Sequence, residues 1–178
     1  MTPLLTTRRL RLRAPAIGDA TRLTQFLGNL EVAKNLARIP HPFTIEHAKH
    51  ILTSWRADAG PNNTRFVIEF GDTGAIGIIG LRSGEDGPHL GYWIGQPFWA
   101  HGIMTEAMKA VVHWYFSVTR ADTILSSAFH FNMASISIQH KLGFVETGRS
   151  SIHCLASGED VECIDTELTR EAFEALRT

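Results

Sequence analysis

The chain has 178 residues, of which 44% are hydrophobic and 20% are charged, values typical of a globular domain with a sizeable core. Its formal net charge of −1 gives no general attraction to nucleic acid, so we expect no nucleic-acid partner. The longest apolar run, Ala75–Leu81, is far too short to cross a bilayer, and the arginine-rich N-terminus lacks the apolar block of a secretory signal. We therefore expect a cytoplasmic protein with no membrane partner, folded as a single domain over residues 1–178.

The first half of the chain predicts strands and helices in alternation. Asp19 and Thr44 belong to the residue types that cap helices, and each precedes a helical pattern of apolar residues. Ala59–Asn63 has the composition of a loop, and Gly71–Gly74 that of a hairpin turn. The expected elements are a strand at Leu10–Arg13, a helix over about Ala20–Leu27, a helix after Thr44 holding Ala48, Ile51, Leu52 and Trp55, and strands at Phe66–Phe70 and Ile76–Leu81.

The second half predicts further strands and helices, again with no repeat or linker between them. Asn132 can cap a helix that Gly143 stops. The expected elements are strands at Leu90–Ile94 and Thr123–Phe129, a long helix from about Ile103, a helix from Asn132, strands running from Phe144 toward Cys154 and over Val161–Leu168, and a terminal helix at Arg170–Leu176. This order predicts one α/β domain with a mixed sheet.

Two cysteines flank the turn-like segment Ala156–Asp160. If a hairpin turns about Gly158 and Glu159, Cys154 and Cys163 lie directly opposite each other on paired strands. We nevertheless expect free thiols, because the cytoplasm disfavours disulfides. The cysteine spacing matches no metal site, and we expect no metal.

The segment Trp99–Ala107 joins a strand to the long helix. Gly102 lets a ligand approach the backbone, since no Cβ stands in the way. No Ser, Thr, Asp or Asn lies just ahead of the helix to satisfy its first amides, so those donors remain open. Such a helix start is an anion site suited to phosphate. A plain strand-to-helix turn with water on the amides is the alternative.

The motifs Leu90–Ala107, Asn132–Ser135 and Lys141–Phe144, in this order and spacing, resemble the GNAT acetyltransferase superfamily. Together with the opening Leu5–Arg13, they are most similar to its RimJ/RimL-type branch, which acetylates the N-termini of ribosomal proteins. The resemblance covers roughly residues 5 to 170. It implies a mixed, mostly antiparallel sheet of about seven strands flanked by helices, and an N-acetyltransferase that uses acetyl-CoA as its cosubstrate.

The resemblance also implies where acetyl-CoA binds. Its pyrophosphate would lie on the amides at the start of the long helix, and its pantetheine arm would pair with the preceding strand like an added strand. At the place where the family usually has Gln or Arg, this chain has Trp99 and so one polar contact fewer. The expected cofactor-binding residues are Ile94, Gly95, Ala100, His101, Gly102, Ile103, Met104, Thr105 and Asn132.

The chemistry needs a neutral amine, a donor for the developing oxyanion and an acid for the leaving thiolate. A backbone N–H near Ile94 can polarise the carbonyl. Many superfamily members have a tyrosine acid where this chain has Gln139, whereas the RimL-like branch has a hydroxyl at the place of Ser135. We expect Ser135 to donate to the CoA sulfur; the alternative is that Ser135 only supports the helix start.

The general base is less well defined. Where the branch often has glutamate, this chain has His89, and a histidine ordinarily titrates near ~6.5, which suits a proton acceptor at neutral pH. A surface histidine at a strand start is the alternative. Glu69 and Glu85 are other carboxylates that the spacing does not select.

The pKa of the acceptor amine indicates which class of amine this site can acetylate. An α-amino group titrates at ~7.7–8.0 and lysine at ~10.4, so neutralising lysine costs about 3.5 kcal/mol more. A site without an evident strong base therefore favours the N-terminus of a protein or peptide. The alternatives are a small-molecule amine acetyltransferase, acting on an aminoglycoside, polyamine or amino acid, and a non-catalytic acyl-CoA-binding module. The sequence leaves a homodimer open.

Overall fold

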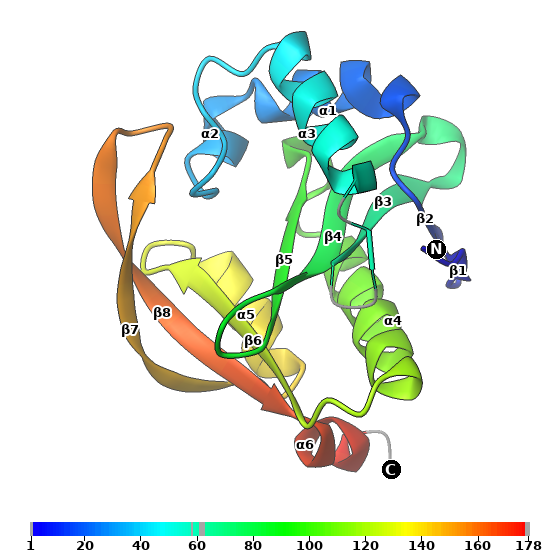
Figure 1. Cartoon of the computed structure of the whole chain (residues 1–178), viewed down its shortest axis with the longest axis vertical. Coiled ribbons are helices and arrows are strands. Elements are labelled where there is room, and N and C mark those ends of the chain that lie inside the picture. Colours follow the sequence, from blue (N-terminus) through cyan, green and yellow to red (C-terminus); the bar gives the residue numbers. More distant parts are fainter. Residues whose placement is uncertain (1, 58, 61–62, 177–178) are drawn as a thin grey trace.

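The computed structural model describes residues 2–57, 59–60 and 63–176, and an eight-stranded sheet forms the centre of the molecule (Figure 1). The strands lie in the spatial order β1-β2-β3-β4-β5-β6-β8-β7, and only the neighbours β5 and β6 are parallel. They are β1 (Leu5–Thr6), β2 (Leu10–Arg13), β3 (Thr64–Phe70), β4 (Ala75–Ser83), β5 (Pro88–Ile94), β6 (Thr123–Phe129), β7 (Val145–Cys154) and β8 (Glu159–Thr169). This single-domain α/β architecture confirms the expected fold class. The strand beyond the expected seven is β1, whose two residues are too few to show an alternating pattern.

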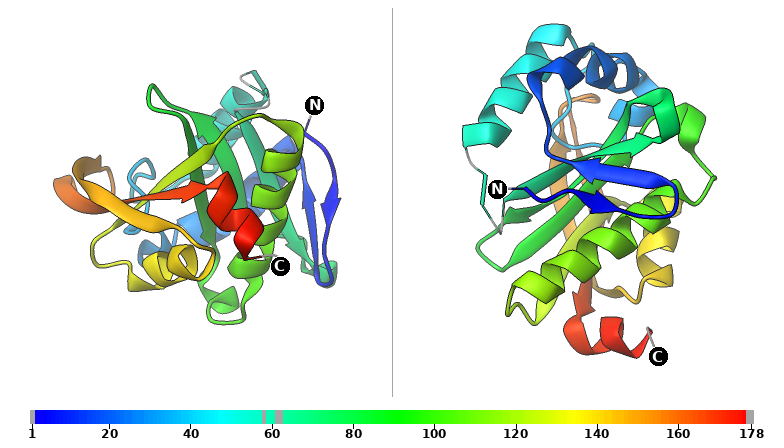
Figure 2. Two further views of the ribbon diagram at one scale, coloured as in Figure 1. Left: turned by 90° about the horizontal axis from the view of Figure 1, so that it is seen from below. Right: turned by 90° about the vertical axis from the view of Figure 1, so that its right-hand side faces the viewer.

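Helices cover both faces of the sheet (Figure 2). One buried cluster joins α1 and α3 to one face, and the largest cluster joins α4 and α6 to the other. Within the described part of the chain, no helix combines the length and apolar character that crossing a membrane requires. The helices are α1 (Ala20–Leu27), α2 (Leu30–Ala33), α3 (Ile45–Ala57), α4 (Ile103–Val118), α5 (Met133–Lys141) and α6 (Arg170–Ala175), with 3-10 turns at Ile17–Asp19, Gly71–Thr73 and Gln96–Phe98.

The expected cap of α1 is wrong in its detail, although the helix has its predicted bounds. Asp19 already has helical backbone angles, because a 3-10 turn leads directly into α1, and its side chain makes no cap hydrogen bond to this helix. Its carboxylate accepts instead from the backbone N–H of Ala16 at 2.8 Å and from the guanidinium of Arg13 at 2.7 Å.

The predicted pairing of the two cysteines is also wrong. Cys154 lies opposite Glu159, and Cys163 lies opposite Ser150, so the β7–β8 hairpin turns earlier than about Gly158 and Glu159. Register in a hairpin is set by the turn, and a small change in its position moves every cross-strand pair. Both thiols are free and buried in one small apolar cluster with Phe129, in agreement with the expected free thiols.

Candidate active site

A cleft opens in the middle of the sheet, where β5 and β6 separate. The two strands pair at His89 and Leu125 and then diverge (Figure 1). The cleft measures about 1460 Å³, and the start of α4, the start of α5 and the loop after α2 contribute to its walls. Most of the predicted site residues line it, namely His89, Ile94, Ala100, Gly102, Ile103, Met104, Thr105, Asn132 and Ser135.

The start of α4 presents unsatisfied amides to this cleft. Gly102 has the left-handed angles φ 70° and ψ 7°, and no side chain caps the helix. The first helical hydrogen bond runs from Glu106 N–H to Gly102 C=O at 3.1 Å, so the amides of residues 103–105 precede it. Free amides at a helix start, together with the helix dipole, form an anion site. His101 does not line the cleft; its carbonyl accepts a hydrogen bond from Arg9 at 3.0 Å.

The edge of β5 that faces the split is open for pairing. Gly95 N–H donates to Ile76 C=O on β4 at 2.8 Å, and ladder bonds alternate, so Tyr92 and Ile94 direct their backbone groups toward the split. The indole N–H of Trp99 donates to the Ile94 carbonyl at 2.8 Å. The Ile94 N–H is therefore the backbone group at this position that can pair with a ligand lying along β5 as an added strand. The Gly95 N–H already donates to β4, and Gly95 does not line the cleft. Its N–H is therefore not available to pair with acetyl-CoA.

Ser135 and Tyr92 meet across the split. Asn132 caps α5 by accepting from the Ser135 N–H at 3.2 Å, which fixes the first turn of this helix. The Ser135 Oγ lies 2.7 Å from the Tyr92 hydroxyl of β5. Burial raises the pKa of Tyr92, although hydrogen bonds with Ser135 and Gln139 act in the opposite direction. Tyr92 therefore stays protonated at neutral pH and remains a donor.

A fully buried glutamine sets the direction of this hydrogen-bond chain. Thr166 donates to the Gln139 Oε1 at 2.7 Å, so the Gln139 amide N–H groups point to the Tyr92 Oη at 3.1 Å and the Ser126 Oγ at 3.2 Å. Because an amide nitrogen only donates, the tyrosine oxygen accepts there, and its own proton is available to the Ser135 Oγ. The Ser135 proton is then free to point into the cleft. Sequence reasoning discounted Gln139 and assigned no role to Tyr92, although both belong to this chain of donors.

Replacing Gln139 by leucine tests the buried network. The change removes the partner that the Thr166 and Ser126 hydroxyls share, although each hydroxyl keeps a backbone carbonyl as acceptor, and a lost hydrogen bond costs about 0.5–1.5 kcal/mol. We expect the free energy of unfolding in urea to fall by that amount. An unchanged unfolding midpoint and slope would show that the network contributes nothing to stability.

His89, the candidate base, lies at the end of the cleft where β5 and β6 are still paired. Its Nε2 lies 2.7 Å from the Asp86 Oδ1, and when Nε2 carries the proton, Nδ1 is the ring nitrogen that can accept one. The hydrogen bond from His89 is the main cause that lowers the pKa of Asp86. Glu69, an alternative base, is bound by Arg13 at 2.7 Å and lies outside the cleft lining, as does Glu85.

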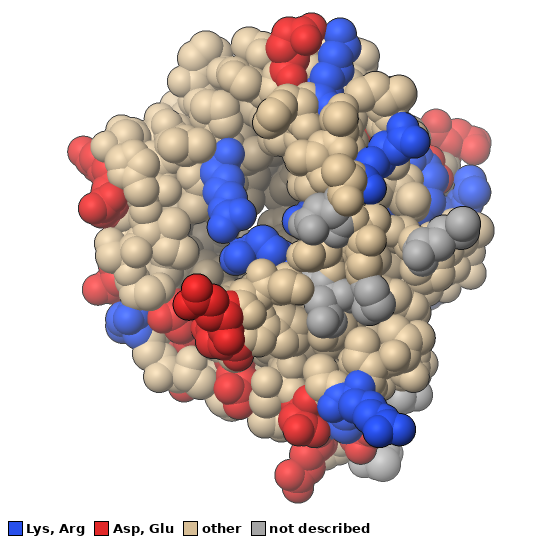
Figure 3. Space-filling model, in the orientation of Figure 1, with Lys and Arg blue, Asp and Glu red and all other residues tan. Residues whose placement is uncertain are grey.

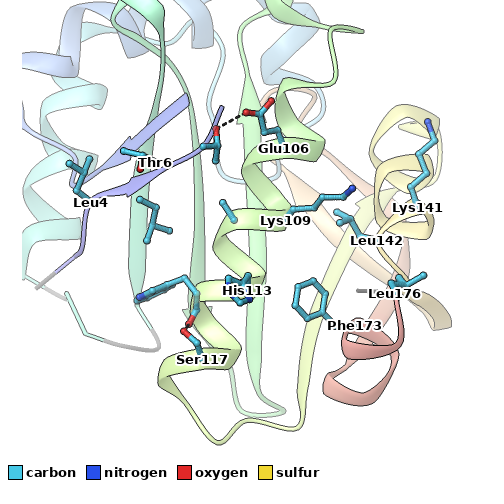
Figure 4. A pocket seen from close by; sticks show the side chains of 14 residues that line it. Leu4, Thr6, Glu106, Lys109, His113, Ser117, Lys141, Leu142, Phe173 and Leu176 are labelled. Atoms are coloured by element: carbon cyan, nitrogen blue, oxygen red, sulfur yellow. Dashed lines mark hydrogen bonds between the residues drawn. The ribbon is translucent and has the colours of Figure 1, made fainter. Parts of the chain in front are cut away.

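A second hollow, of about 800 Å³, runs along the outer side of α4 between β1 and α6 (Figure 4). Glu106 lines this hollow, and its carboxylate accepts hydrogen bonds from the Thr7 hydroxyl at 2.6 Å and from the Arg9 Nε at 2.7 Å. Burial opposes ionisation of Glu106, but these hydrogen bonds prevail and lower its pKa. Arg9 also holds the His101 carbonyl, so Glu106 anchors the turn that precedes α4.

The fold, the split strands and the open helix start together define an acetyltransferase of one family. Residues 9–145 match the family model described as an acetyltransferase (GNAT) domain, and the chain belongs to this family. It is an acetyl-CoA-dependent N-acetyltransferase, in agreement with the resemblance of its motifs to the RimJ/RimL-type branch. The uncapped α4 amides beside Gly102 fit the phosphates of acetyl-CoA, and the free edge of β5 fits its amide-bearing arm.

Particular relatives agree with this assignment. A Bacillus subtilis protein named as a ribosomal N-acetyltransferase, YdaF, is 22% identical over 162 residues, which is 88% of each chain. The structure of a ribosomal-protein-S5-alanine acetyltransferase from Vibrio fischeri superposes with a TM-score of 0.76 at 20% identity and covers 95% of this chain and 97% of its own. The Microcin C7 self-immunity acetyltransferase MccE, solved with acetyl-CoA and AMP, gives a TM-score of 0.77 at 17% identity over 92% and 93% of the two chains. At these identities the structures establish a common fold.

Proposed function

We propose that this protein transfers acetyl to the α-amino group of a protein or peptide N-terminus. The observation that carries the proposal is the absence of an available carboxylate base from the cleft. Among the described lining residues, Glu31 is the only acid, and its carboxylate lies 2.6 Å from the Lys34 Nζ. Such a site is matched to an amine of pKa ~7.7–8.0, because a lysine at ~10.4 needs a stronger base.

The start of α4 would hold acetyl-CoA, which supplies the acetyl thioester when it is bound. The amides of Ile103, Met104 and Thr105 would bind the phosphates, with Ala100 and Gly102 shaping the turn that lets them approach. The Ile94 N–H on the open edge of β5 would pair with the arm and polarise the carbonyl.

Ser135 would act as the acid at the leaving sulfur, supported by Tyr92. The Ser135 hydroxyl gives its proton into the cleft while it accepts the proton of Tyr92, which lies 2.7 Å behind it. Gln139 keeps this direction because it can only donate to the tyrosine oxygen. His89 lies three residues before Tyr92 on β5, about 10 Å away along the strand, so it would take the amine proton on Nδ1 through a chain of waters, with Asp86 holding the ring by Nε2.

The substrate names of the relatives support the same class of acceptor. YdaF is named for ribosomal acetylation, and the Vibrio fischeri enzyme for an alanine of a ribosomal protein. Neither name identifies the acceptor of this chain, and homodimer formation stays a prediction.

The test is acetyl-CoA-dependent CoA release over a panel of amines. The panel holds peptides with free and with blocked N-termini, polyamines, aminoglycosides and free amino acids. We expect turnover on the free peptides and loss of turnover when the N-terminus is blocked. Turnover confined to a small amine would overturn the proposal and place the protein among small-molecule acetyltransferases; acetyl-CoA binding without any turnover would point to a binding module.

A further inference from the structure

The cleft continues onto the face of the sheet that carries α1, α2 and α3. Trp93 of β5 packs with the apolar cluster of that face, and alternation along a strand places His89 and Gly91 on the same side. Gly91 lies opposite Gly80 on β4, and a Cβ built on Gly91 would meet no atom within 4 Å. The floor of this part of the cleft is therefore bare backbone, which a ligand can approach closely.

The charged side chains that line the cleft are mostly basic. Among the described residues, the charged ones that line the cleft are Glu31, Lys34, Arg38, Arg65, Arg82 and Lys141. The single acid, Glu31, is already bound by Lys34. Figure 3 shows Lys and Arg side chains beside the hollow at the centre of this face, with acidic side chains directly below them. Because the whole chain has a net charge of −1, the positive charge is a local property of the cleft.

Arg38 and Arg82 both line the cleft. Arg82 ends β4 opposite His89 and is half-buried, whereas Arg38 reaches in from the loop after α2. Burial, and then the positive charge of Arg38, lower the pKa of Arg82, so the two guanidinium groups lie within range of mutual electrostatic repulsion. Within the described chain neither makes a hydrogen bond or an ion pair, and Asp86, which attracts Arg82, is hydrogen-bonded to His89. An anion between the two arginines would relieve this repulsion.

We propose that this part of the cleft binds a carboxylate of the acceptor, so that the enzyme prefers N-termini followed by Asp or Glu. The inference rests on the proposed function and names its substrate class. Guanidinium groups bind carboxylates through paired, charge-assisted hydrogen bonds, which gives geometric selectivity as well as attraction. A polycationic amine would meet repulsion at the same place.

The position of Arg82 sets which acceptor residue is read. Arg82 lies beside His89, and about 10 Å of strand separates that point from Tyr92 at the transfer site. An extended peptide advances about 3.5 Å per residue, so the third residue lies about 7 Å from the transfer site, and the long side chains of the second and third residues and of the arginines span the remaining distance. The phosphate site is at the other end of β5, beyond Ile94, and the arginines are not part of it.

The test uses three peptides of equal length that differ only at the second and third positions, with Glu-Glu, Gln-Gln or Lys-Lys. For the wild-type enzyme we expect kcat/KM about tenfold higher for Glu-Glu than for Gln-Gln, and lowest for Lys-Lys. This preference should weaken as salt is added. Free glutamate forms a separate arm, and turnover on glutamate but not on peptides would keep the carboxylate site and identify a small-molecule acceptor.

Charge reversal at Arg38 and neutralisation at Arg82 assign the preference to these side chains. We expect Arg38→Glu and Arg82→Gln each to remove most of the preference for Glu-Glu while the KM for acetyl-CoA stays unchanged. Arg120→Glu makes the same charge change on an exposed residue outside the cleft lining and is the matched control. Binding of the three peptides to the CoA-loaded enzyme, followed by fluorescence anisotropy of a C-terminal label, gives a readout that needs no turnover.

Different results would overturn the carboxylate site and the proposed N-terminal acetylation. Equal kcat/KM and equal affinity for the three peptides, or a preference for Lys-Lys, would overturn the carboxylate site while N-terminal acetylation stands. Arginine-dependent binding of the Glu-Glu peptide without acetylation of any peptide would keep the carboxylate site and overturn the proposed function.

Discussion

Replacing Ser135 by alanine is expected to lower kcat about 100-fold, because loss of a positioned proton donor costs 10²–10⁴-fold. The Asn132 cap contacts the Ser135 backbone N–H rather than its side chain, so the start of α5 stays intact. We therefore expect an unchanged dissociation constant for acetyl-CoA, and a lower melting temperature because the buried Tyr92 hydroxyl loses its partner. The measurement is steady-state CoA release together with calorimetric binding of acetyl-CoA.

Two further variants distinguish a role of Ser135 as a proton donor from a purely structural role. Ser137→Ala removes a hydroxyl from the same helix and the same cleft and should leave kcat unchanged, because the Ser137 hydroxyl makes no hydrogen bond to the described residues. Tyr92→Phe should lower kcat less than Ser135→Ala and by a constant factor from about pH 6 to pH 9, since burial raises the pKa of Tyr92 above that range. Wild-type turnover by Ser135→Ala would remove Ser135 from the chemistry.

Replacing Gly102 by valine is expected to weaken acetyl-CoA binding about 10- to 30-fold. The glycine has φ 70°, where an L residue costs about 1–2 kcal/mol, and the branched side chain would stand over the open amides of α4. A Cβ at this position would have the Arg9 Nη2 as its nearest neighbour at 3.7 Å, so the protein itself has room for it. The loss should therefore appear in ligand affinity beyond what stability explains.

Gly158→Val is the matched control for backbone strain. Gly158 has φ 73° and open surroundings in the β7–β8 hairpin, and it does not line the cleft. Both variants should lose similar stability in urea, but only Gly102→Val should lose affinity for acetyl-CoA. Equal affinities of Gly102→Val and the wild type would refute the assignment of the phosphate site.

Local patterns in the sequence were enough to predict most elements and the uncapped start of α4. The strand Leu10–Arg13 and the helix Ala20–Leu27 follow from alternation and helical spacing, which depend on near neighbours only. The uncapped helix start beside Gly102 follows from the absence of capping residues, whereas the expectation for Ser135, three residues after Asn132, comes from the resemblance to the RimL-like branch.

Contacts between distant segments left no comparable pattern. Tyr92 meets Ser135 because β5 and α5, which are far apart in sequence, border the same split. Successive side chains of β5 lie on opposite faces of the sheet, with Tyr92 on the α4 side and Trp93 on the α1 side. This alternation is the only signal in the sequence that bears on the contact, and it does not identify the partner of Tyr92. Arg38 reaches Arg82 from an irregular loop, and the register of Cys154 depends on where one turn begins.

The central claim is transfer to an α-amine, and one peptide that carries both amines tests it most directly. The peptide has a free N-terminus, glutamate at its second and third positions and a lysine near its C-terminus. After incubation with the enzyme and acetyl-CoA near neutral pH, fragment-ion mass spectrometry locates the acetyl group. We predict acetylation of the N-terminal nitrogen with the lysine unmodified, whereas acetyl on the lysine Nζ, or on neither amine, would contradict the proposed function.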